Sequence, residues 1–185
     1  MQTFDSVVQL FSSTVARFRI ATQAGDVYMC AGRTNYLNEE RAVVEVDTGR
    51  LFALWRAEPN GLHAAQAHGH ERTWRRDDKF QHAEEGFQGG KDNPVPLADI
   101  SCQIGRRRHP IIQKKWLLFE RTVGWNEHRF PYVAFTNGVT RTIWLAANGA
   151  KYFPVECHVR EADRLQELAG LPGGGWKTLD VLVPR

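Results

Sequence analysis

Residues 1–60 alternate between strand-like and helix-like hydrophobic patterns. Three segments have the period-two alternation or the apolar, β-branched content of strands: residues 17–20, 27–30 and 42–46. Leu51, Leu54 and Trp55 then recur at helical spacing behind a capping residue, Asp47 or Thr48, and residues 59–61 (Pro-Asn-Gly) are expected to end this helix. We interpret residues 1–60 as a β-rich N-terminal scaffold with one helix.

A second helical pattern begins near residue 77, where Phe80, Ala83 and Phe87 fall on one face. Asp77 or Asp78 is the expected N-cap of this helix. The Gly- and Pro-containing residues 89–96 that follow are typical of an extended loop. An ordinary capped amphipathic helix is therefore the structural interpretation of this segment.

The most informative pattern is a strand, a glycine turn and a helix in direct succession. Residues 130–135 are apolar and aromatic, Asn137-Gly138 interrupts them, and apolar positions then recur at helical spacing until Asn148-Gly149. Thr136 or Asn137 is the expected N-cap, and residues 153–159 form the next strand. We expect this strand, helix and strand to form one unit of a mixed sheet.

The remaining patterns are shorter. Residues 115–122 and 131–135 are expected to pair as core strands around a turn at residues 124–127. Residues 161–169 predict a short helix that ends at Gly170, and residues 178–183 a last strand. The predicted fold class is α/β (α+β), a mixed sheet with short helices in a single domain of 185 residues, whose core, residues 74–170, carries the Gly138 turn.

Composition narrows the class of protein. A hydrophobic content of 42% with six Trp indicates a globular chain. The three Cys, an odd number without a CxxC pair, are typical of reduced thiols in the cytosol. The sequence contains no run of the roughly 20 apolar residues that a membrane span needs and no signal-peptide pattern. We expect a cytoplasmic protein without a membrane span.

The glycine turn is also the strongest candidate for chemistry. The first turn of a helix presents backbone N–H groups without intrahelical partners, and such a turn favours anions. The predicted phosphate-binding residues are Asn137, Gly138, Val139, Thr140 and Arg141. In the alternative, Arg141 is structural and forms an ion pair with Glu156 or another carboxylate.

Two resemblances follow from these residues. Gly138-Val139-Thr140-Arg141, the helix after it and Phe153-Pro154-Val155 resemble the Gly-x-x-Arg signature of the ParB/sulfiredoxin superfamily. A wider set of motifs resembles the plasmid fertility-inhibition factors of that superfamily: Leu54-Trp55-Arg56, Lys79-Phe80, Ala83-Glu84, Gly86-Phe87, residues 93–98 and residues 137–145.

The resemblance implies a ParB/sulfiredoxin-like fold, binding and hydrolysis of ATP, and cleavage of DNA. It also implies inhibition of conjugative and T-DNA export through type IV secretion. The candidate catalytic residues for these reactions are Arg141, Thr140, Lys79, Glu84 and Glu156. Sulfiredoxins carry a Cys and a His in this signature, but Val139 and Thr140 stand there, so thiol chemistry is not expected at this turn.

Cleavage of a phosphate ester would also require a metal or a base. Asp77 and Asp78 are weak candidates to hold a divalent cation such as Mg²⁺. His63, His68 and His70 have a spacing that suits a transition metal, but a polar surface loop is the favoured interpretation.

The densest positive charge lies at residues 106–115 and is interleaved with aromatic residues. Its candidate DNA-binding residues are Arg106, Arg107, Arg108, Lys114 and Lys115. These residues either contact the phosphates of a transferred DNA strand, with little sequence preference, or belong to a solvated basic hairpin. At the level of function, the alternative to an enzyme is a non-enzymatic inhibitor that binds the secretion coupling protein or the relaxosome.

Overall fold

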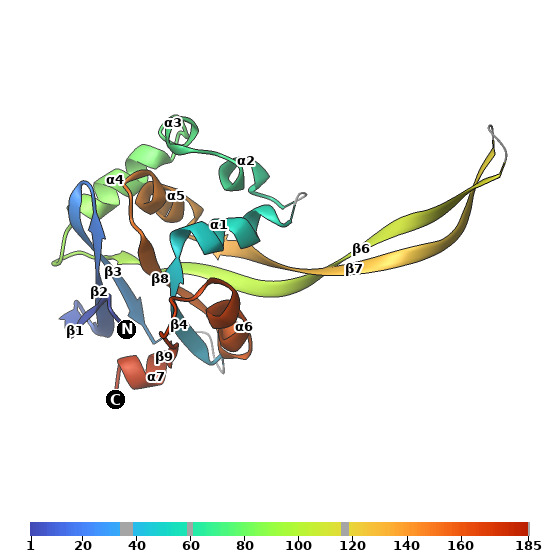
Figure 1. The fold of residues 1–185 in the computed structure, drawn as a ribbon. Helices are drawn as coiled ribbons and strands as arrows, with labels where there is room; N and C mark the ends of the chain where they lie inside the picture. The colour runs from blue at the N-terminus through green and yellow to red at the C-terminus, as the bar shows by residue number, and fades with distance from the viewer. Residues whose placement is uncertain (34–38, 59–60, 116–118, 185) are drawn as a thin grey trace.

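The computed structural model describes residues 1–33, 39–58, 61–115 and 119–184, and within them two β-sheets carry the fold (Figure 1). The first sheet has the strand order β1-β2-β3-β5, with β1 at Phe4–Leu10, β2 at Ser13–Thr22, β3 at Gly25–Gly32 and β5 at Val95–Pro96. Its long strands form an antiparallel meander, whereas β5 pairs with β3 in parallel.

The second sheet is mixed and has the strand order β7-β6-β8-β4-β9 in the described residues. These strands are β4 (Arg41–Asp47), β6 (Ala98–Lys115), β7 (Phe119–Asn137), β8 (Tyr152–His158) and β9 (Lys177–Thr178). Strand β6 is parallel to β8, and the other pairs are antiparallel. The predicted fold class, a mixed α+β domain with short helices, is confirmed.

Short helices pack around the second sheet. They are α1 (Thr48–Arg56), α2 (Ala64–Ala67), α3 (Glu71–Trp74), α4 (Phe80–Gln88), α5 (Val139–Ala147), α6 (Val159–Ala169) and α7 (Leu179–Leu182). Asp47 caps α1 as predicted, because its Oδ1 accepts a hydrogen bond from the Arg50 N–H at 2.9 Å. Helix α1 ends at Arg56, and Pro59 and Asn60 lie outside the described residues. No helix in the described part of the chain is both long and apolar enough to cross a membrane.

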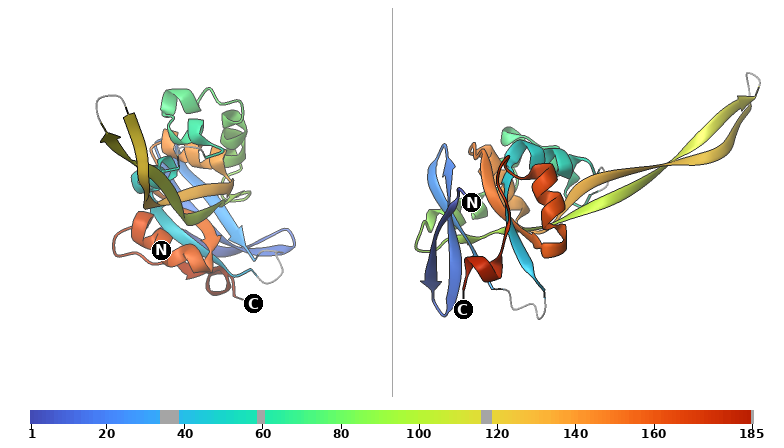
Figure 2. Two further views of the ribbon diagram at one scale, coloured as in Figure 1. Left: turned by 90° about the vertical axis from the view of Figure 1, so that its right-hand side faces the viewer. Right: turned by 60° about the horizontal axis from the view of Figure 1, so that its bottom comes forward.

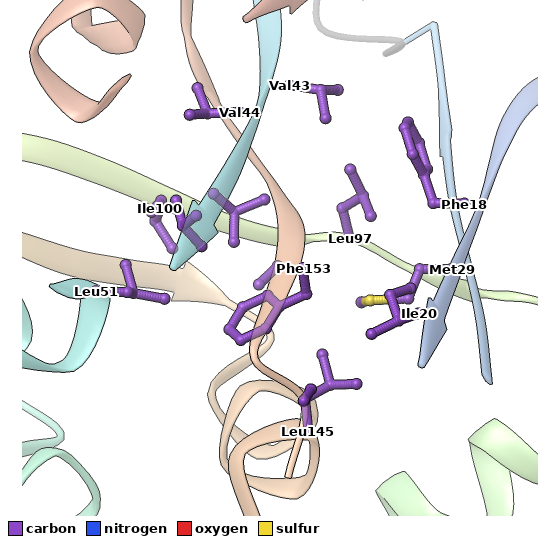
Figure 3. Close-up of a cluster of buried hydrophobic side chains, with 14 of the residues drawn as sticks. Phe18, Ile20, Met29, Val43, Val44, Leu51, Leu97, Ile100, Leu145 and Phe153 are labelled. Atoms are coloured by element: carbon purple, nitrogen blue, oxygen red, sulfur yellow. The ribbon is translucent and has the colours of Figure 1, made fainter. Parts of the chain in front are cut away.

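One hydrophobic core joins the two sheets (Figure 3). Phe18, Ile20 and Met29 of the first sheet share one cluster with Leu145 of α5 and Phe153 of β8, and all five side chains are fully buried. Helix α5 is therefore anchored by its apolar face, and its N-terminus is held in a fixed place.

The predicted unit of strand, helix and strand is present as β7, α5 and β8, but its cap differs. Gly138, in the left-handed conformation (φ 88°), is the residue before α5, and no side chain in the described part of the protein caps this helix. Asn137 Oδ1 instead accepts a hydrogen bond from the Gly138 N–H at 2.7 Å. The prediction of Thr136 or Asn137 as N-cap was wrong because the left-handed glycine separates them from the helix.

Helix α4 also begins later than predicted. Lys79 precedes it, and Asp77 Oδ1 accepts a hydrogen bond from the Lys79 N–H at 3.0 Å in the turn before the helix. Asp77 and Asp78 therefore belong to this turn and are not the N-cap, whereas the predicted buried face of Phe80, Ala83 and Phe87 is confirmed.

Strands β6 and β7 form a long twisted hairpin that extends away from the rest of the molecule (Figures 1 and 2). The predicted pairing of residues 115–122 with residues 131–135 was wrong, because residues 119–122 and 131–135 belong to the same strand, β7, and both pair with β6. Gly124 lies inside β7 opposite Ile111, next to an irregularity in the register, so residues 124–127 are not a turn. Trp116 and residues 117–118 lie outside the described residues.

The predicted last strand at residues 178–183 was also wrong. Strand β9 stops at Thr178, whose Oγ1 accepts a hydrogen bond from the Val181 N–H and thereby caps α7. Leu179 and Leu182 are both buried at a helical spacing, which favours a helix over a strand.

Candidate functional site

The turn between β7 and α5 requires glycine for two reasons. Gly138 has a positive φ of 88°, which side chains with a Cβ rarely adopt. A Cβ at this position would lie 2.6 Å from the Cα of Ala98 and 3.1 Å from Nη2 of Arg141. The turn therefore lies directly against the start of β6, and Arg141 folds back beside it.

The N-terminus of α5 has no capping partner among the described residues. The first intrahelical bond runs from the Thr142 N–H to the Gly138 carbonyl at 3.0 Å, and no side chain caps the helix. The backbone N–H groups of Val139, Thr140 and Arg141 therefore have no partner within the described part of the chain. Aligned with the dipole of a nine-residue helix, they favour an anion.

Arg141 adds a cation to this turn. Its Nε is buried and has no hydrogen-bond partner among the described residues, and its Nη2 lies 3.4 Å from the carbonyl of Leu97. Burial lowers the pKa of Arg141, and the half-buried thiol of Cys30 opposes this shift. A guanidinium without a carboxylate is an unsatisfied donor set that a phosphate group would satisfy.

The structural alternative for Arg141, an ion pair with Glu156, is not formed. Glu156 Oε1 accepts a hydrogen bond from Nε of Arg41 at 2.8 Å, and Arg41 also pairs with Asp99. Burial raises the pKa of Glu156, although Arg41 opposes this shift. Glu156 is therefore committed to a half-buried ion cluster on neighbouring strands of the sheet.

A cavity of about 480 Å³ opens at this turn. One wall is the end of β7 and the start of α5, and the other is formed by α2 and the turn before α4. Its lining residues are His63, Gln66, Asp77, Asp78, Lys79, Thr136, Asn137, Gly138, Val139, Thr140 and Arg141. All five predicted phosphate-binding residues thus line one cavity, together with Lys79 and both predicted metal ligands.

The second wall is held in place by Asp77. Its Oδ2 accepts a hydrogen bond from Gln66 Nε2 at 3.1 Å, and its Oδ1 accepts from the Lys79 N–H. Helix α2 is fixed in turn by Trp74, whose Nε1 donates to the Gln66 carbonyl at 2.8 Å. This arrangement places the exposed side chains of Asp78 and Lys79 at the cavity, where neither has a hydrogen bond or ion pair with another described residue.

The other predicted catalytic carboxylates lie elsewhere. Glu84 is exposed on α4, and neither Glu84 nor Glu156 is among the lining residues of the cavity. Among the carboxylates that line it, Asp77 has both oxygens engaged, so Asp78 is the one that is free to act.

The donor set of the cavity suits Mg²⁺ only in combination with a phosphate ligand. Within the described residues, no three His, Cys, Asp or Glu side chains are grouped in a way that would hold a metal ion. Mg²⁺ is commonly bound by one or two carboxylates together with substrate phosphates. Asp78, with Asp77 beside it, would hold the ion in that way, whereas His68 and His70 do not line the cavity.

The predicted DNA-binding residues lie on the hairpin of β6 and β7. Arg106 and Arg108 are exposed, and each lies 3.6–3.8 Å from Glu127, as does Arg129. Arg107 lies on the opposite face, over the ring of Phe130 at 5.3 Å from its centroid. Lys114 and Lys115 lie at the far end of β6.

Sequence patterns did not identify the contributions of Gln66 and Cys30 to this region. Gln66 lies in a four-residue helix with no motif, and Cys30 is more than one hundred residues from Arg141. No local pattern predicts these contributions, because only the tertiary fold brings residues 63–79 and 136–141 together.

The described residues thus form a mixed α+β protein with a cavity at the uncapped N-terminus of α5, beside the half-buried Arg141. The profile of the family described as "Plasmid Fertility inhibition factor" matches residues 43–170, and this chain belongs to that family. The family predicted from the sequence motifs is therefore confirmed.

The fold is similar to a solved crystal structure of the Oncogenic Suppression Activity Protein, described as a plasmid fertility inhibition factor, in a gold(I) cyanide derivative. The similarity has a TM-score of 0.68 at 24% sequence identity and covers 96% of this chain and 79% of that chain. No curated protein matches the sequence.

Proposed function

We propose that this fertility inhibition factor blocks conjugative or T-DNA export through a type IV secretion system by cleaving DNA in the cytoplasm of the donor cell. In this proposal the cavity at α5 binds ATP and hydrolyses it, and it also binds the phosphodiester of the transferred strand. Both reactions need a site that stabilises negative charge on phosphate oxygens.

The observation that carries the proposal is the unsatisfied donor set at α5. Three backbone N–H groups of α5 and the buried Nε of Arg141 have no partner among the described residues, and Arg141 lines the cavity opposite Lys79. Leaving a buried charged donor without a partner costs free energy, and an anionic ligand would remove that cost. The cavity is accordingly suited to phosphate.

The chain supplies different groups for binding and for proton transfer. Arg141 and the N–H groups bind and orient the phosphate from one wall, and Lys79 faces them from the other. Asp78, which is exposed and unpaired among the described residues, is placed to accept a proton from water or to hold Mg²⁺ with the phosphate. When bound, Mg²⁺ supplies charge neutralisation and lowers the pKa of coordinated water.

The experiment compares Arg141→Lys with Arg160→Lys, a matched control at an exposed arginine on α6. Lys keeps the charge at position 141 but loses the planar fork, and a charge-assisted hydrogen bond contributes roughly 1.5–3 kcal/mol. We expect nicking of plasmid DNA and hydrolysis of ATP to fall about tenfold to hundredfold in Arg141→Lys only, and EDTA to abolish nicking by the wild type. Undiminished activity in a folded Arg141→Lys protein would show that the cavity does not catalyse nicking or ATP hydrolysis.

A non-enzymatic inhibitor is the second candidate, because the distal part of the hairpin exposes apolar side chains. Ile111, Ile112, Val123 and Trp125 are each at least 49% exposed, as on a surface that binds a protein partner. Such an inhibitor would bind the secretion coupling protein or the relaxosome. An Arg141→Ala variant that is inactive in nicking but still blocks conjugation would favour this candidate.

A further inference from the structure

Three ring side chains form a continuous ladder on one face of β7. His128, Phe130 and Tyr132 alternate along the strand and therefore project to the same side. The rings of His128 and Phe130 lie 6.4 Å apart at an interplanar angle of 11°, and those of Phe130 and Tyr132 lie 6.0 Å apart at 43°. We name these three residues the ring ladder.

The ladder lies flat because the paired strand has a glycine beneath it. Gly105 is opposite Phe130 in the register, and a Cβ on Gly105 would lie 2.6–3.0 Å from three atoms of the Phe130 ring. The ring therefore folds across β6 instead of standing upright from the ribbon. Tyr132 is fixed in the same direction by its hydroxyl, which donates to Gln103 Oε1 at 2.7 Å.

The strand of the ladder leads to the cavity. Thr136, four residues beyond Tyr132 on β7 and next to an irregularity in the register with β6, is a lining residue of the cavity. At about 3.3 Å per residue, the distance along the strand from Tyr132 to Thr136 is roughly 13 Å. The ladder and the cavity are thus neighbours on one strand.

The charge of the hairpin is positive. Residues 103–132 contain seven Arg and Lys and two Glu, a net charge of +5, so the rest of the chain carries −2 of the total of +3. On the face of the ladder, Arg107 lies over Phe130, and His109 is its neighbour at the next position on that side. The partner that this face fits is therefore a polyanion with flat, apolar groups.

We propose that the ring ladder is a binding track for single-stranded DNA and guides it to the cavity at α5. This rests on the proposed function, because it names an unpaired strand as the substrate of that cavity. Rings can stack only on bases whose faces are exposed, whereas a duplex presents its phosphates and base edges. The ladder thus selects an unpaired strand, and Arg107 contacts its backbone.

The test measures binding of fluorescein-labelled oligothymidylate and of a labelled duplex of equal length in EDTA, where DNA is not cut. The variant is the full chain with Phe130→Leu and Tyr132→Leu, and the matched control is Trp125→Leu. Trp125 is an exposed aromatic residue on the opposite face of the same hairpin, paired with Pro110. We expect the dissociation constant for the single strand to rise about fivefold to hundredfold in the double variant, with the duplex and the control nearly unchanged.

A second variant separates loss of stacking from damage to the hairpin. Phe130→Trp keeps a stacking ring, so it should bind the single strand as tightly as the wild type does. Three results would each overturn the track. The double variant could bind the single strand as tightly as the wild type does, or it could lose affinity equally for the single strand and the duplex. Phe130→Trp could also lose as much affinity for the single strand as the double variant does. Hydrolysis of ATP by the wild type is the separate readout of the cavity: its absence would count against the proposed function, not against the track.

Discussion

Gly138 determines the geometry of the candidate site at the scale of a single residue. It combines a positive φ with backbone contact to Ala98, and Arg141 lies against it. The free N–H groups of α5 and the half-buried guanidinium of Arg141 therefore depend on the absence of one methyl group.

We predict that Gly138→Ala destabilises the protein by more than the cost of positive φ alone, which is about 1–2 kcal/mol. Gly173→Ala is the control, because Gly173 also has a positive φ (70°) but nothing lies within 4 Å of a Cβ there. Chemical denaturation gives both free energies of unfolding. Equal losses at the two positions would contradict the close contact with Ala98.

Glu156 gives a second prediction at the residue scale, through the pH dependence of stability. Burial raises its pKa in the folded protein above the ordinary value of 4.5. The folded state then binds the proton more tightly than the unfolded chain, so this contribution to stability is complete below pH 4.5 and decreases as the pH rises through the folded pKa. Glu156→Gln should remove that decrease.

The measurement is the free energy of unfolding of the wild type and of Glu156→Gln between pH 4 and pH 8. Because Glu156 pairs with Arg41 and does not line the cavity, we also expect the variant to keep its rate of ATP hydrolysis. A parallel pH dependence of the two proteins would show that the carboxyl group has no raised pKa.

At the scale of elements, the basic hairpin gives a prediction about DNA. Glu127 lies within 4 Å of Arg106, Arg108 and Arg129, and such exposed ion pairs are weak. Replacing residues 106, 107 and 108 by Ala should reduce the slope of log K against log salt by roughly 2–3, since each lost phosphate contact changes it by about 0.9.

Glu127→Gln is the opposite variant, and it should tighten DNA binding because it frees three arginines. Both variants are measured by fluorescence anisotropy at several salt concentrations. A triple variant with the wild-type salt slope would mean that the hairpin is only a solvated surface.

The elements also show what local sequence can predict. The order β7, α5, β8 follows from residues within thirty positions, and the apolar spacing and glycine turn were sufficient to predict it. The long hairpin was missed, because Gly124 and Asn126 resemble turn residues although each has a partner across the ribbon. Similarly, the second wall of the cavity depends on the fold of residues 63–79 against α5, which no local pattern encodes.

At the scale of the whole molecule, the positive charge and the candidate chemistry occupy connected regions. The hairpin carries a net +5, the cavity lies at its base, and a single core from both sheets holds α5 in place. Long-range electrostatic attraction would bring DNA to the hairpin first and to the cavity second.

The central claim is that Arg141 and the N-terminus of α5 bind phosphate. The most direct measurement is calorimetric titration of a non-hydrolysable ATP analogue with Mg²⁺ into the wild type, Arg141→Lys and the control Arg160→Lys. We predict that the dissociation constant rises about tenfold to hundredfold in Arg141→Lys and is unchanged in the control. Equal affinity of the wild type and a folded Arg141→Lys protein would contradict the claim.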